Sequence, residues 1–161
     1  MTYSQKYSLV HFVQPISAGT EFNMDEWPLH ITVADVFAID RITTKIDAKL
    51  EELLMGLPVI TVSAAGEATL GTTLVVLIQK DNELLILHTD VVNLLEMNQA
   101  VFNNPEFTRN GFVPHATIQK CEQLHTGDTI GIDSLTLIDM FPQSNWRLRK
   151  VLTTFKLQGK Q

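Results

Sequence analysis

The sequence predicts an α+β fold in which strands outnumber helices. Three observations indicate this class: short β-branched runs alternate apolar and polar residues, two segments carry apolar residues at helical spacing, and the elements in chain order look like one unit used twice. The 161 residues match one domain of ordinary size, which we expect to span residues 1–161. Hydrophobic residues at 45% and charged residues at 19% are typical of a chain that folds into a globular core.

The first half is expected to open with two strands separated by a loop. Residues 7–15 are apolar and end at a proline, which suits a buried strand, and residues 16–28 read as a loop. The β-rich run 29–37 predicts the second strand. Its alternation sets His30 and Thr32 on one face and Asp35 on the opposite face.

A helix and a group of strands follow. Asp40 is expected to cap a helix over 41–57, where leucine and isoleucine recur at helical spacing before Gly56 and Pro58. Residues 59–80 alternate β-branched residues around two glycines, which predicts two or three antiparallel strands. Residues 80–86 are expected to supply another turn and a short strand.

The second half is expected to begin with a helix over 87–102 that ends before Pro105. Turn-forming residues fill the loop 103–111, and the run 112–120 predicts a strand with His115 and Thr117 on one face. The tail predicts two last strands, in 129–141 and 146–157.

Charge and cysteine content limit the classes of function. A net charge of −6 argues against a broad grip on duplex DNA, which relies on many Lys and Arg contacts to phosphates. The single cysteine, Cys121, excludes an internal disulfide and a cysteine-based zinc site within one chain, which favours a reducing cytoplasm. No apolar run reaches the roughly 18 residues of a membrane span, and residues 1–15 lack a signal-peptide pattern. We expect a cytoplasmic monomer without membrane contact.

Two short motifs stand out on the predicted strands. The runs WPLHITV (27–33) and FVPHATI (112–118) each place a threonine two residues after a histidine, shortly after a proline. Polar groups on core strands cost free energy unless they find partners. One such pair alone is weak evidence, because a lone strand histidine is usually structural. Its duplication in the same context favours a function for both.

Two such pairs in one cleft suit acid/base chemistry on a phosphodiester. One imidazole can take a proton from water while the other gives a proton to the departing sugar oxygen. Threonine hydroxyls can donate to the non-bridging oxygens, where charge sits in the transition state. No metal is needed, and no H-x-H, HExxH or carboxylate cluster supports the alternative of a metal on His30 and His115.

The duplicated pair PLHITV and PHATIQK resembles the motifs of the two-histidine (2H) phosphoesterase superfamily, over nearly the whole chain. The nearest branches are the bacterial 2′-5′ RNA ligase-like proteins and cyclic phosphodiesterases. The resemblance implies two pseudo-symmetric α+β lobes, whose antiparallel sheets form a central cleft with helices on the outside. It also implies that His30 and Thr32 form the first catalytic motif, and His115 and Thr117 the second.

The resemblance further implies the chemistry. Members commonly hydrolyse a 2′,3′-cyclic phosphate to a 2′-phosphate, or act on 2′-5′ linkages, without metal or other cofactor. The implied partner is a small nucleotide, or an RNA 3′-end that bears a cyclic phosphate. By family analogy His115 is the base and His30 the acid, with the reverse left open. Two alternatives remain: a non-catalytic module that binds a nucleotide or RNA end, and a 2′-5′ RNA ligase.

Three further residues are candidates for substrate binding. A basic residue often follows the second motif in the family, and Lys120 stands at a similar place, although an ideal strand would turn it away from His115. Trp27 and Phe112 could stack on a nucleobase, with core packing as the alternative for each. We expect structural or solvated roles for the other histidines, which are His11, His88 and His125.

Overall fold

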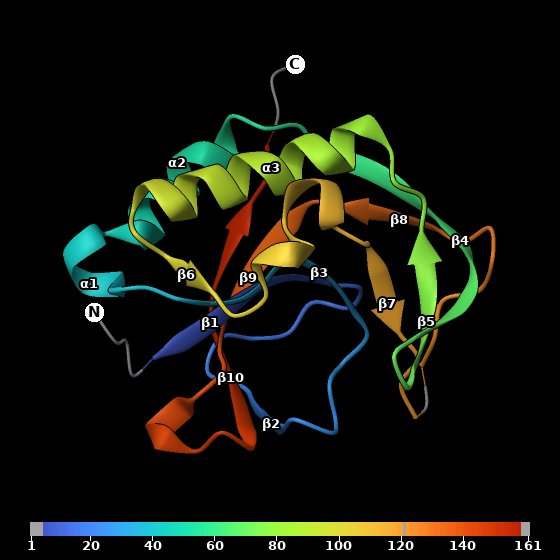
Figure 1. Cartoon of the computed structure of the whole chain (residues 1–161), viewed down its shortest axis with the longest axis horizontal. Coiled ribbons are helices and arrows are strands. Elements are labelled where there is room, and N and C mark those ends of the chain that lie inside the picture. The colour runs from blue at the N-terminus through green and yellow to red at the C-terminus, as the bar shows by residue number, and fades with distance from the viewer. Residues whose placement is uncertain (1–4, 121, 159–161) are drawn as a thin grey trace.

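Two antiparallel sheets dominate the computed structural model, which describes residues 5–120 and 122–158 (Figure 1). The strands are β1 (Lys6–Phe12), β2 (Glu21–Asn23), β3 (His30–Ala38), β4 (Ile60–Leu70), β5 (Thr73–Ile78), β6 (Val101–Phe102), β7 (His115–Thr117), β8 (Thr129–Ile132), β9 (Ser134–Asp139) and β10 (Leu148–Lys156). The helices are α1 (Arg41–Thr44), α2 (Ile46–Met55) and α3 (Asn82–Met97), with short 3-10 turns η1 (Pro105–Phe107), η2 (Arg109–Gly111) and η3 (Pro142–Ser144). The predicted α+β class with two antiparallel sheets is confirmed.

The two sheets do not correspond to the two halves of the chain. One has six strands in the order β2-β10-β9-β1-β3-β6, and so joins the N-terminal strands to the C-terminal ones. The other has four strands in the order β7-β5-β4-β8, all from the middle of the chain. Each sheet nevertheless contains one motif strand, β3 or β7. This arrangement allows two motifs far apart in sequence to face each other.

The two long helices lie together over one side of the six-stranded sheet (Figure 1). Helix α2 buries Ile46, Leu50 and Leu54, which recur every four residues and so share one face. Helix α3 packs against β3, the strand that holds the first motif. One continuous cluster of buried apolar side chains draws residues from both sheets and both helices. The motif strands therefore share a common support.

The first predicted helix is divided in the structure. Asp40 caps it as expected, because its Oδ1 accepts a hydrogen bond of 3.0 Å from the Thr43 N–H. Lys45, however, has a left-handed backbone with φ of 54°, which ends α1 and starts α2 in a new direction. The expectation of one helix over 41–57 was wrong at this residue.

The start of the second helix was also predicted wrongly. Residues 80–86 form no strand, since α3 begins at Asn82. The Asp81 side chain caps it by accepting a hydrogen bond of 2.8 Å from the Leu84 N–H. The helix ends at Met97 instead of continuing to residue 102, and Val101–Phe102 form the short strand β6 beside β3.

Several strand boundaries differ from the expected ones. The predicted strand 112–120 is reduced to the three residues of β7, because the turn η2 and Pro114 precede it and the chain bends at Lys120. The predicted loop 16–28 contains the edge strand β2, which pairs with β10.

Cys121 lies outside the described residues. In residues 5–120 and 122–158, no helix is long and apolar enough to cross a membrane.

Candidate active site

Strand β3 holds the first motif in the six-stranded sheet, one strand from the edge. It pairs with β1, and His30 lies opposite Phe12 while Thr32 lies opposite Val10. Both motif residues are half-buried and alternate with the fully buried Ile31 and Val33. The period of two therefore turns His30 and Thr32 away from the core, as the sequence predicts.

A β-bulge interrupts the alternation directly after the motif. Val10 pairs with Thr32, but the next residue of β1, Leu9, pairs with Ala34, so β3 has one extra residue at this point. Val33 and Ala34 are both buried, and the half-buried Asp35 then takes the phase of His30 and Thr32. The expected position of Asp35 on the opposite face was wrong, because the bulge shifts the alternation by one residue.

A backbone hydrogen bond fixes the His30 ring. Its Nδ1 lies 2.8 Å from the Pro28 carbonyl oxygen, and because a carbonyl only accepts, Nδ1 must carry the hydrogen and donate. In the neutral ring Nε2 then holds the lone pair, and no described residue forms a hydrogen bond with it. This arrangement leaves Nε2 available to a ligand.

Aromatic side chains pack around His30. The Trp27 ring lies against the imidazole with a centroid separation of 4.4 Å, and Phe12 meets it edge-on at 6.1 Å. Phe22 in turn packs on Trp27 at 4.9 Å. Burial among these groups lowers the pKa of His30 to about 4, with a smaller contribution from the charge of His115 and an opposing one from the Pro28 carbonyl. His30 is therefore neutral at pH 7.

His115 repeats the same hydrogen bond on the second sheet. Its Nδ1 donates to the Val113 carbonyl oxygen at 2.7 Å, again two residues before the histidine, and leaves Nε2 without a hydrogen bond to any described residue. Strand β7 forms the edge of the four-stranded sheet, where His115 pairs with Leu77 and Thr117 with Val75. Strands β3 and β7 contact each other, and His115 acts electrostatically on His30. The two motifs thus converge.

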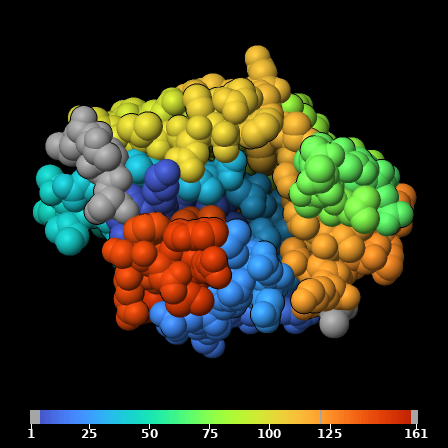
Figure 2. Space-filling model, turned by 60° about the horizontal axis from the view of Figure 1, so that its bottom comes forward, coloured from blue at the N-terminus to red at the C-terminus, as the bar shows by residue number. Residues whose placement is uncertain are grey.

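A cavity of about 640 Å³ opens between these strands. Three motif residues line it: Thr32, His115 and Thr117. Figure 2 shows the hollow, with the blue β3 segment at its floor, the green β4–β5 hairpin on one side and the yellow η1 region above. The hydroxyls of Thr32 and Thr117 form no hydrogen bonds within the described chain, so both can donate to a ligand. His30 is not among the lining residues, although His115 acts on it electrostatically.

The other predicted site residues occupy different places. Phe112 lines the cavity but is only 6% exposed, and one face of its ring is covered by His88. Trp27 packs on His30 and is not a lining residue. Lys120 is exposed and borders a separate hollow together with Gln119 and His125. The structure therefore brings together the two motifs and the edge of Phe112, but not Lys120.

His88 links the two motif segments, a role that the sequence alone does not indicate. Its Nδ1 donates to the Val33 carbonyl of β3 at 2.6 Å, and its Nε2 accepts the Arg109 N–H of η2 at 2.9 Å. The ring stacks on Phe112 with a centroid separation of 3.8 Å and an interplanar angle of 2°. The link therefore runs from β3, through α3, to the segment that leads into β7.

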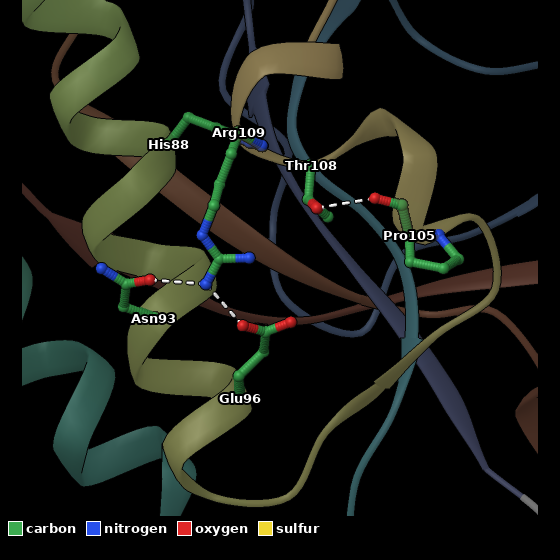
Figure 3. Close-up of polar contacts among 6 residues, drawn as sticks. All are labelled: His88, Asn93, Glu96, Pro105, Thr108 and Arg109. Carbon is green, nitrogen blue, oxygen red and sulfur yellow. Dashed lines mark hydrogen bonds and ion pairs between the residues drawn. The ribbon is translucent and has the colours of Figure 1, made fainter.

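The Arg109 side chain strengthens this link from outside (Figure 3). It reaches back to α3, where it bonds to Asn93 and forms an ion pair with Glu96. Thr108 closes the preceding turn, η1, because its hydroxyl donates to the Pro105 carbonyl oxygen at 2.7 Å. Arg109 has a left-handed backbone with φ of 56°, so these contacts hold a conformation that the residue would not favour alone.

Two signals for these missed residues are visible in hindsight. His88 falls in phase with Leu84, Val91 and Leu95 on the apolar face of α3, which marks it as a buried histidine that needs partners. Asp35 interrupts an apolar strand.

No group of three or more His, Cys, Asp or Glu side chains in the described part of the chain is arranged to hold a metal ion.

The chain belongs to the 2′-5′ RNA ligase superfamily, whose sequence model matches residues 7–150. No curated protein matches the sequence. Solved structures of similar fold include a phosphoesterase, with 16% identity, a TM-score of 0.61 and coverage of 95% of this chain and 98% of that one. The complex of E. coli LigT with NADP+ has 15% identity and a TM-score of 0.61, with coverage of 97% and 99%.

Two more similar structures complete this comparison. The complex of E. coli LigT with 3′-AMP has 16% identity and a TM-score of 0.60, and covers 95% of this chain and 98% of that one. A protein of Thermus thermophilus, TT0787, has 13% identity and a TM-score of 0.59, with coverage of 97% and 100%. At such low identity these likenesses show the fold alone, and they confirm the expected architecture.

Proposed function

We propose that this protein is a metal-independent phosphoesterase that hydrolyses a 2′,3′-cyclic or 2′-5′ phosphodiester of a nucleotide or RNA end. The observation that carries the proposal is the matched pair of histidines. Each ring is held through Nδ1 by the carbonyl two residues before it, and no described residue forms a hydrogen bond with either Nε2. Two free threonine hydroxyls accompany them. Acid/base catalysis by two imidazoles needs this arrangement.

We propose one proton transfer for each histidine. Nε2 of one ring takes a proton from water, whose oxygen attacks phosphorus, and the bond from phosphorus to the 3′ oxygen breaks. Nε2–H of the other ring gives its proton to that leaving oxygen, and the product is a 2′-phosphate. Thr32 and Thr117 donate to the non-bridging oxygens, where negative charge increases in the transition state.

The environment of His30 favours it as the base. Its pKa of about 4 leaves Nε2 unprotonated at neutral pH, which suits a group that must accept a proton and does not suit one that must deliver it. We therefore propose His30 as the base and His115 as the acid, the reverse of the assignment that family analogy gives. The negative charge of a bound phosphodiester favours the imidazolium form of a neighbouring histidine.

The comparisons support a nucleotide as the ligand. The superfamily to which the chain belongs is named for action on 2′-5′ linked RNA, and E. coli LigT has been crystallised with NADP+, 3′-AMP and ATP. A cavity of about 640 Å³ is within the usual range for a small-molecule site. We propose a mononucleotide or a short RNA end as the partner.

Purified protein should be assayed against the four nucleoside 2′,3′-cyclic phosphates and against 2′-5′ dinucleotides, with and without a chelator. We expect release of the 2′-phosphate product and no loss of rate in chelator. Failure to cleave any of these esters would contradict a phosphoesterase. Tight nucleotide binding without product would indicate the non-catalytic module, and joining of 2′,3′-cyclic phosphate ends to 5′-hydroxyl ends would indicate a ligase.

A further inference from the structure

The β-bulge in β3 brings a carboxylate to the same cavity as the motif residues. Thr32 and Asp35 both line the cavity, although they are three residues apart on a strand and an unbroken alternation would place them on opposite faces. Bulges often lie beside active sites, where they redirect a side chain. The backbone of β3 is thus shaped so that Asp35 faces the ligand.

The Asp35 carboxylate has no partner within the protein. It forms no hydrogen bond or ion pair with any residue in 5–120 or 122–158. A carboxylate that only stabilised the fold would be expected to find a donor when half-buried. Its two oxygens therefore remain available to whatever occupies the cavity.

The cavity has little positive charge to balance this carboxylate. Its described lining consists of apolar side chains, Gly71, four threonines, His115 and Asp35, without lysine or arginine. The two cationic side chains at the η2 turn have partners outside the cavity lining: Lys80 donates to the Asn110 carbonyl, and Arg109 forms an ion pair with Glu96. Lys120 borders a different hollow. Two imidazoles and two hydroxyls suffice for one phosphodiester charge, but the lining offers no lysine or arginine to neutralise a second phosphate.

We propose that the cleft selects esters with a single phosphate group, and that Asp35 is the residue that excludes a second one. This inference rests on the proposed function and narrows its substrate class. The preferred substrate is a nucleoside 2′,3′-cyclic phosphate or a 2′-linked ester with an uncharged 5′ end. Asp35 accepts hydrogen bonds from hydroxyl or amino groups of such a ligand, and it repels a 5′-phosphate.

Coulomb's law indicates the size of the effect. A second phosphate bound inside a cavity of this volume lies within about 10 Å of Asp35, close to one Debye length at 0.1 M salt. Repulsion at that separation, with the effective dielectric constant of a protein surface, corresponds to about three- to tenfold in affinity. The discrimination should become smaller as salt is raised.

The test compares adenosine 2′,3′-cyclic phosphate with the same compound carrying a 5′-phosphate. For the wild-type protein we expect kcat/KM to be about three- to tenfold lower for the 5′-phosphorylated ester at low ionic strength. Asp35→Asn should bring the two values to within about twofold. Glu52→Gln, which removes the same charge from the exposed face of α2, should leave the wild-type ratio unchanged.

A binding measurement separates this inference from the proposed catalysis. Calorimetry with adenosine 2′-phosphate and adenosine 2′,5′-bisphosphate should give the same preference and the same response to Asp35→Asn, whether or not the protein turns over any ester. If no ester is cleaved but this preference is present, the catalytic proposal fails and the specificity inference stands. A wild-type preference for the bisphosphate, an unchanged ratio in Asp35→Asn, or no binding of either nucleotide would overturn the inference.

Discussion

The two motif strands differ in almost everything except the hydrogen bond that orients the histidine. Strand β3 has nine residues and lies between β1 and β6, whereas β7 has three residues at the edge of its sheet. His30 is packed between Trp27 and Phe12, while the hydrogen bond that holds His115 is exposed to solvent. In both, Nδ1 donates to the carbonyl two residues earlier. The two histidines therefore have the same tautomer but different environments.

This difference teaches how one motif can serve two roles. The local backbone bond fixes which nitrogen faces the ligand, and it needs only two residues of chain. The surroundings then set the protonation state, and burial among aromatic rings keeps His30 neutral. In the proposed mechanism, two different environments would let the same residue type act once as a base and once as an acid.

Removing either histidine should give the largest effect. His30→Ala and His115→Ala should each lower kcat by about 10²- to 10⁴-fold, the usual contribution of one general acid or base. His125→Ala, on the loop after β7, is the matched control and should keep full activity. Steady-state kinetics on the best cyclic phosphate checks this, and full rate in either catalytic variant would contradict a shared role of the two strands.

The two threonines should have smaller and similar effects. Thr32→Val and Thr117→Val keep the β-branched shape and remove one donor to the phosphate oxygens, so we expect about a 10²-fold loss of kcat in each. KM should change much less, because the charge on these oxygens increases in the transition state. A loss confined to KM in both variants would show that the hydroxyls bind the ground state only.

Substitution of His88 should disrupt the contacts that join β3 to the segment before β7. His88→Ala removes two hydrogen bonds and the stack on Phe112, and leaves the half-buried Arg109 N–H without an acceptor. We expect the free energy of unfolding to fall by about 2 kcal/mol, roughly 30-fold in the unfolding equilibrium. His88→Gln retains a donor and an acceptor and should lose less. Urea denaturation measures both, and equal stability of all three proteins would contradict the link.

The smallest expected effect comes from Trp27, and it depends on pH. Trp27→Leu opens the His30 ring to water, so its pKa should rise from about 4 towards the ordinary value near 6.5. A base must be unprotonated, so the acidic limb of kcat/KM should move to higher pH. Near pH 5 the variant should lose about tenfold relative to wild type, and near pH 7.5, where His30 is unprotonated in both proteins, the two rates should be nearly equal. An unmoved limb would show that Trp27 does not set the state of His30.

The sequence predicts the parts of the site that depend on local periodicity. A period of two puts His30 with Thr32, and His115 with Thr117, without any tertiary information. The bulge that redirects Asp35 cannot be predicted in this way, because it arises from the pairing of β3 with β1. Asp81 caps a helix through Leu84, three residues later. An aspartate at this spacing indicates the start of a helix, so the prediction of a strand in 80–86 could have been avoided from the sequence.

Partners that are distant in sequence account for the other differences. His88 contacts Val33 and Arg109, which lie 55 and 21 residues away, so its bridging role exists only in the folded chain. Trp27, a candidate to stack on a nucleobase, packs on a histidine three residues later. Lys120 was considered from family analogy, and the bend after β7 directs it to another hollow. Local pattern predicts the candidate catalytic groups, and tertiary packing sets their environment.

A nitrogen NMR titration of the histidine rings tests the central claim most directly. In the free protein we predict that His30 keeps its neutral Nδ1–H form down to about pH 4. Adenosine 2′-phosphate should shift the Nε2 resonances of both His30 and His115 with one dissociation constant, and leave those of His125 in place. A His30 that titrates near its ordinary pKa, or a ligand that shifts only one of the two rings, would contradict the account.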